Sequence, residues 1–110
     1  MKFVILASLL FSFTSFAKDM NLSCKASFNM ETVFESEVTL GNEKVNVGEF
    51  ENFIYFVTQK ADGRVELQSH DMDEPSRSYA TASLKNVGDY VELSIWNRAY
   101  IMDVRCTLLN

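Results

Sequence analysis

The sequence predicts an all-β domain: a small antiparallel meander barrel or a two-sheet sandwich of about six to eight strands. Three observations predict it. Short segments alternate apolar and polar residues, turn residues separate these segments, and the only two cysteines lie near opposite ends of the chain. A length of 110 residues suits one domain.

Residues 1–17 have the pattern of a secretory signal peptide. Lys2 supplies the positive start, an apolar stretch follows, and Ser15 and Ala17 are the small residues that signal peptidase requires. The apolar stretch is shorter than the ~20 residues that a membrane-spanning helix needs. We therefore expect residues 1–17 to be removed and residues 18–110 to form one exported domain. This domain would be secreted or periplasmic and not a transmembrane protein.

Cys24 and Cys106 are predicted to form a structural disulfide. They can make only one intramolecular pair, and an oxidising compartment favours the bond. A closed zinc site would need four ligands, whereas the chain has one histidine. The spacing also lacks the C-x-x-C pattern of a redox centre. Each cysteine occupies one of the alternate positions that are apolar in its segment. Both are therefore expected to point inward and to join neighbouring first and last strands.

The segment 22–40 predicts a β-hairpin, with one long bent strand as the alternative. Its even positions are mainly apolar and its odd positions mainly polar, as in a half-buried strand. Gly41 and Asn42 then predict a turn.

The segment 50–59 is ambiguous by pattern. At its centre both odd-numbered and even-numbered positions are apolar, as in a strand that is covered on two faces. Several of its apolar residues also match helical spacing. Its aromatic and β-branched residues and the turn at Gly63 favour a strand over a helix. A return strand is expected from Val65.

Further strands are expected over residues 78–84, 91–95 and 100–108, with turns between them. Closure of the first strand onto the last favours a meander barrel, because closure removes exposed edges. A sandwich remains open as the alternative, because a disulfide can also cross between sheets.

Composition excludes several functions. The net charge of −5 and the absence of a basic cluster argue against nucleic-acid binding. No glycine-rich phosphate-binding motif occurs, and no cofactor is expected.

The sequence offers little for catalysis, so we expect no enzyme and assign no catalytic residue. His70 is the only histidine, and no serine lies in a G-x-S-x-G elbow. His70 and Asp71 are strand neighbours that point to opposite faces. A small hydrolase that uses His70 and nearby carboxylates is kept only as an alternative.

The acidic loop after His70 is a weak candidate metal site. Asp71, Asp73 and Glu74 could offer oxygen ligands to Ca²⁺, but the loop lacks the frame of an EF-hand. A solvated acidic loop is the simpler interpretation, and no metal is assigned. A second alternative function uses this loop: an inhibitor that inserts residues 71–76 into the cleft of a secreted enzyme.

Binding is the function that the sequence favours. Tyr79, Tyr90 and Trp96 are expected on outer strand faces and form the candidate binding surface, unless a second sheet or loop covers them. A barrel interior could instead hold a small apolar ligand, although its bulky side chains would tend to fill it. The residues expected to line this interior are Phe28, Met30, Phe34, Phe56 and Met102. We expect a non-catalytic binding domain, with a protein partner preferred over a small apolar ligand.

Overall fold

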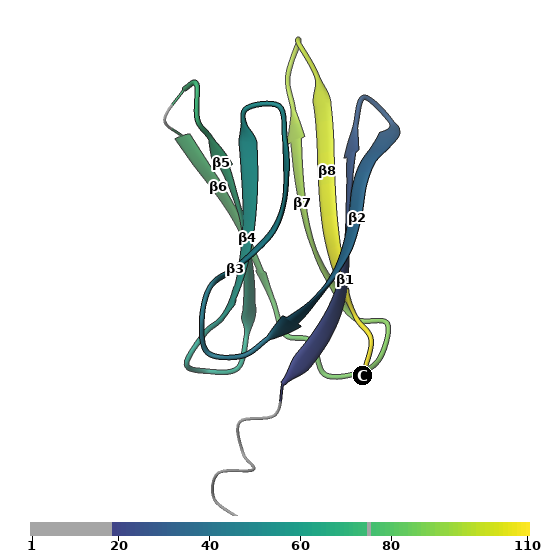
Figure 1. The fold of residues 1–110 in the computed structure, drawn as a ribbon, viewed down its shortest axis with the longest axis vertical. Coiled ribbons are helices and arrows are strands. Elements are labelled where there is room, and N and C mark those ends of the chain that lie inside the picture. Colours follow the sequence, from purple (N-terminus) through teal and green to yellow (C-terminus); the bar gives the residue numbers. More distant parts are fainter. Residues whose placement is uncertain (1–18, 75) are drawn as a thin grey trace, which may run out of the picture.

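The computed structural model describes residues 19–74 and 76–110, and these form two four-stranded antiparallel sheets packed face to face (Figure 1). The all-β prediction is thereby confirmed. The predicted signal peptide, residues 1–17, lies outside the described residues. The strands are β1 (Met20–Phe28), β2 (Glu31–Leu40), β3 (Val45–Phe50), β4 (Phe53–Gln59), β5 (Val65–Asp71), β6 (Ser76–Ala82), β7 (Tyr90–Trp96) and β8 (Ile101–Leu108).

The molecule is a sandwich rather than a closed barrel. One sheet has the order β2-β1-β8-β7 and the other has the order β3-β4-β5-β6. The strand order therefore follows the chain around the molecule, as in a meander. In the described part of the chain, no ladder joins β2 to β3 or β6 to β7, so each of these four strands is a sheet edge.

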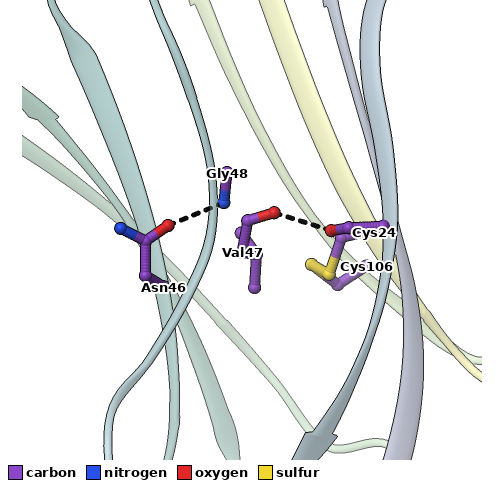
Figure 2. The surroundings of a disulfide bond; sticks show 6 residues. Cys24, Asn46, Val47, Gly48 and Cys106 are labelled. Atoms are coloured by element: carbon purple, nitrogen blue, oxygen red, sulfur yellow. Dashed lines mark hydrogen bonds between the residues drawn. A yellow bond between two sulfur atoms is a disulfide. The ribbon is translucent and has the colours of Figure 1, made fainter.

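The predicted disulfide between the first and last strands is confirmed. Cys24 and Cys106 are 82 residues apart and lie directly opposite each other in the β1–β8 ladder. Both are fully buried, and Figure 2 shows them across the interior from Val47 of β3. The Ser36 hydroxyl on β2 donates a 2.6 Å hydrogen bond to the Val47 carbonyl oxygen, which ties β2 to β3 at this edge.

The hairpin predicted over residues 22–40 is confirmed as β1 and β2. Its turn consists of Asn29 and Met30, whose φ angles of 51° and 74° are both positive. Because Met30 belongs to the turn, the strand alternation does not reach it, and its side chain is 80% exposed. The expectation that Met30 lines the interior is therefore wrong.

The segment 50–59 is extended and not helical, but it is not one strand. Phe50 ends β3, and a tight turn that includes Glu51, with φ 55°, precedes β4. On β4 the side chain of Tyr55 is fully buried, whereas Phe56 lies on the outer face and is only half-buried. The expectation that Phe56 lines the interior is also wrong.

The core lies between the two sheets and is aliphatic along most of its length. None of the described residues forms a helix that is long and apolar enough to cross a membrane. The fully buried core residues with the largest side chains are Leu22, Leu40, Tyr55, Val57, Val65, Leu67 and Val104.

The two ends of the sandwich differ. The connections β1–β2, β3–β4, β5–β6 and β7–β8 all lie at one end, at the top of Figure 1. The start of β1 and the end of β8 lie at the opposite end. The sheets diverge towards the end with the four hairpin connections, which we call the loop end.

Candidate functional site

The loop end contains a cleft of about 770 Å³ that we call the loop-end cleft. Three aromatic side chains, Phe28, Phe53 and Tyr100, form its apolar floor. They come from the end of β1, the start of β4 and the residue before β8, so both sheets contribute.

The aromatic floor is a packed cluster. The Phe28 and Tyr100 rings are stacked with centroids 5.3 Å apart, and Phe53 meets Tyr100 edge-on at 5.5 Å. Phe50 also packs against Phe28, with ring centroids 5.1 Å apart. Offset and edge-on contacts of this kind hold aromatic rings in fixed positions. The floor therefore presents a rigid apolar surface.

Four carboxylates lie on the rim of the cleft. Glu51, Asp71, Asp73 and Glu74 line it, and Arg98 is the cation among the lining residues. Carboxylates that lie close together in water create a negative potential over the cleft.

Asp71 differs from the other rim carboxylates because it organises its own loop. Its Oδ1 atom accepts hydrogen bonds from Asn52 Nδ2 at 2.6 Å, from the Asp73 backbone N–H at 3.0 Å and from the Glu74 backbone N–H at 3.3 Å. By contrast, Glu51, Asp73 and Glu74 form no ion pair within residues 19–74 and 76–110. These three carboxylates are therefore available to a ligand.

A smaller cavity of about 210 Å³ extends the cleft between β6 and β7, and we call it the side channel. Ser76 and Ser78 of β6 line one side and Ile95 of β7 lines the other. Asp71 and Glu74 line both cavities, so the negative rim continues into the side channel.

Large apolar side chains are exposed around the same end. Met30 lies in the β1–β2 turn, Met72 follows β5, and Trp96 ends β7. Their exposed fractions are 80%, 61% and 72%. Exposed methionine and tryptophan side chains are typical of surfaces that bind partners.

The three aromatic residues of the predicted binding surface do not form one patch. Tyr79 lies on β6, in the sheet formed by β3 to β6. Tyr90 and Trp96 lie on the outer face of the other sheet, at opposite ends of β7. The Arg105 guanidinium lies 4.1 Å from the Tyr90 ring centroid. Only Trp96 lies at the loop end.

The candidate calcium ligands Asp71, Asp73 and Glu74 all lie on the cleft, but they do not converge on one point. Across residues 19–74 and 76–110, no three His, Cys, Asp or Glu side chains are placed to hold a metal ion. Asp71 Oδ1 is already directed at backbone and amide N–H groups.

His70 lies away from the cleft. Its ring packs 4.9 Å from that of Phe56, and its Nε2 atom is 3.0 Å from Gln68 Oε1. Burial lowers the pKa of His70, and the positive charges of Arg77 and Lys44 lower it further. Asp71 lines the cleft instead, so the structure places His70 and Asp71 on opposite faces of β5.

Comparisons with protein-family models, curated proteins and solved structures find no match for this chain. The candidate site therefore depends on its own geometry. Sequence reasoning missed the cleft as a unit. One signal was present: Phe28, Phe53 and Tyr100 each lie next to a predicted or observed turn, where aromatic residues can meet across strand ends.

Proposed function

We propose that this chain is an exported, non-catalytic binding domain whose loop-end cleft binds a basic, partly apolar segment of a protein partner. The observation that carries the proposal is the combination of a rigid aromatic floor with carboxylates on the rim. Lysine and arginine side chains suit such a cleft, because their apolar stems pack on aromatic rings while their charged ends reach carboxylates.

A protein partner is favoured over a small apolar ligand because further apolar side chains are exposed at the same end of the sandwich. Met30, Met72 and Trp96 are exposed around it, and a small molecule inside the cleft would leave them uncovered. Methionine side chains adapt to different partner shapes, whereas a tryptophan is a frequent binding hot spot.

Export is part of the proposal and has two supports. The signal-peptide pattern of residues 1–17 directs a chain to the secretory route. The Cys24–Cys106 disulfide suits an oxidising compartment, such as the periplasm or the cell exterior.

The test uses the mature domain, residues 18–110, and a capped heptapeptide in which lysine alternates with apolar residues (Lys-Val-Lys-Phe-Lys-Val-Lys). We expect calorimetric titration to detect binding of this peptide and no binding of its glutamate counterpart. The triple variant Glu51→Gln, Asp73→Asn, Glu74→Gln removes the three free rim carboxylates and spares Asp71. We expect it to weaken binding by about tenfold or more.

A matched control removes the same charge elsewhere. The variant Glu35→Gln, Glu37→Gln, Glu43→Gln neutralises two carboxylates of β2 and one of the β2–β3 connection, none of which lines the cleft. We expect this control to change affinity by no more than about twofold. Equal losses in the two triple variants, or equal binding of the lysine and glutamate peptides, would contradict the proposal.

A further inference from the structure

The four sheet edges of the sandwich are not equally protected. β2 carries Glu35 and Glu37, and β7 carries Glu92. β3 contains a bulge between Asn46 and Gly48. Charged side chains and bulges are the usual means by which an exposed edge avoids pairing with another chain.

β6 is less protected than β2 and β3, because it has no bulge and, like β7, carries only one charged residue. It pairs with β5 in an unbroken register from Ser76 to Ala82, without a bulge. Arg77 is its one charged residue, and the other residues of the strand are small or neutral: Ser76, Ser78, Tyr79, Ala80, Thr81 and Ala82. Alternate backbone N–H and C=O groups of such an edge strand point away from the sheet and can pair with an added strand.

The edge beside β6 is also open. At the opposite side of the sandwich, Ser36 Oγ on β2 bonds to the Val47 carbonyl oxygen on β3 and ties the two sheets together. Within residues 19–74 and 76–110, no ladder and no backbone hydrogen bond joins β6 to β7. The side channel occupies this position, between Ser76 and Ser78 on one side and Ile95 on the other.

The charge of the side channel indicates what would fit there. Asp71 and Glu74 line it, and among the residues that the structure describes no lysine or arginine does. An added strand would place alternate side chains over this channel, where basic groups would meet the carboxylates. A second copy of this chain is a poorer match, because its net charge is −5.

We propose that the basic partner segment binds as an extended strand added to the free edge of β6, with alternate side chains entering the side channel. This inference rests on the proposed function and specifies its binding mode. Backbone pairing to β6 would supply a register, while Asp71 and Glu74 would select basic side chains.

The test is hydrogen exchange of the mature domain, residues 18–110, with and without the lysine heptapeptide. We expect binding to slow the exchange of alternate β6 amides, those that do not bond to β5, by about tenfold or more. The edge amides of β2, which lie on the other side of the sandwich, serve as the internal control and should not change.

A matched peptide isolates the backbone contribution. N-methylation of alternate residues keeps the charges and side chains but removes the N–H groups that would face β6. We expect one of the two alternate methylation patterns to weaken binding by about tenfold or more, because only one set of N–H groups faces the edge.

Two proline variants test β6 itself. Ser78→Pro and Tyr79→Pro affect neighbouring amides, one of which bonds to β5 and one of which faces outward. The variant that keeps the unfolding temperature of the wild type is expected to lose about tenfold or more in affinity. If both variants unfold, the exchange and methylation results decide.

The outcomes separate the two proposals. Carboxylate-dependent binding with unprotected β6 amides and no effect of either methylation pattern would overturn strand addition and leave the proposed function standing. No binding of the lysine peptide at all would overturn both. Protection of β6 amides without peptide, together with a doubled mass in sedimentation, would identify a second copy as the occupant and also overturn the inference.

Discussion

Gly48 is required at its position because of the side chain opposite it. A Cβ atom at Gly48 would lie 2.5 Å from Phe34 Cε1, and the Phe34 ring itself packs on Tyr55, with centroids 5.5 Å apart. We expect Gly48→Ala to lower the free energy of unfolding by about 1–3 kcal/mol, because the ring must move within the packed interior.

Gly41→Ala is the matched control for Gly48→Ala. The nearest atom to a Cβ at Gly41 is Asp19 Oδ1, at the ordinary contact distance of 3.7 Å. We expect this variant to change the free energy of unfolding by no more than about 0.5 kcal/mol. Urea titrations followed by circular dichroism measure both values. Equal midpoints for the two variants would contradict the assignment of the contact.

At the scale of single residues, alternation predicted burial well inside strands and failed at their ends. Leu22, Cys24 and Ala26 are fully buried, as the pattern of β1 indicates. Met30 shares their parity but lies in the turn, where the chain reverses and the alternation stops. On β4, apolar residues occupy both faces, so only packing against the other sheet selects Tyr55 over Phe56.

At the scale of elements, one carboxylate helps to hold the connection between β6 and β7, together with backbone bonds such as that from the Gly88 N–H to the Leu108 carbonyl oxygen. Asp89 Oδ2 accepts hydrogen bonds from the backbone N–H groups of Lys85 and Asn86, both at 2.9 Å. These two bonds hold the pKa of Asp89 below its usual range, and the bond from Asn86 has the larger effect.

A lowered pKa in the folded state makes stability depend on pH in a known direction. The contribution of Asp89 is complete above the pKa of the unfolded chain, near pH 4, and is lost as the pH falls through the lower folded pKa. We expect the difference in unfolding free energy between wild type and Asp89→Asn to be constant from about pH 5 to 7 and to shrink below about pH 4. Urea titrations at each pH measure it, and a difference that grows in acid would contradict the assignment.

Strand existence was predictable from the sequence, whereas strand boundaries were less so. The boundary at Glu51 was hidden because the turn before β4 contains neither glycine nor proline, and the positive φ of Glu51 has no sequence signature. The strand expected over residues 78–84 ends at Ala82, yet Leu84 is still buried, because the connection packs it against the core.

At the scale of the whole molecule, the disulfide closes the meander. Cys24 and Cys106 join strands that are 82 residues apart in sequence, so the bond removes much of the conformational freedom of the unfolded chain. We expect the double variant Cys24→Ala, Cys106→Ala to lose about 2–5 kcal/mol of stability. Urea titration measures the loss, and mass spectrometry after alkylation without reduction should find no free thiol in the wild type. An unchanged midpoint would contradict this role.

The loop-end cleft was not predictable from the sequence because it forms only when the two sheets pack together. Its residues come from three separate connections and from the ends of strands such as β1, and no local pattern says that Glu51, Glu74 and Arg98 line one cleft. The acidic loop and the exposed Trp96 were recognisable individually. Their common position follows from the meander, which places the four hairpin connections at one end of the sandwich (Figure 1).

The β1–β8 ladder has one more consequence. The other ladders join strands that follow each other directly in the chain, whereas this ladder joins the first to the last. A polypeptide truncated before Ile101 could still fold several hairpins, but Cys24 would keep a reactive sulfhydryl. The native disulfide can therefore form only in a chain that includes Cys106, the sixth residue of the last strand.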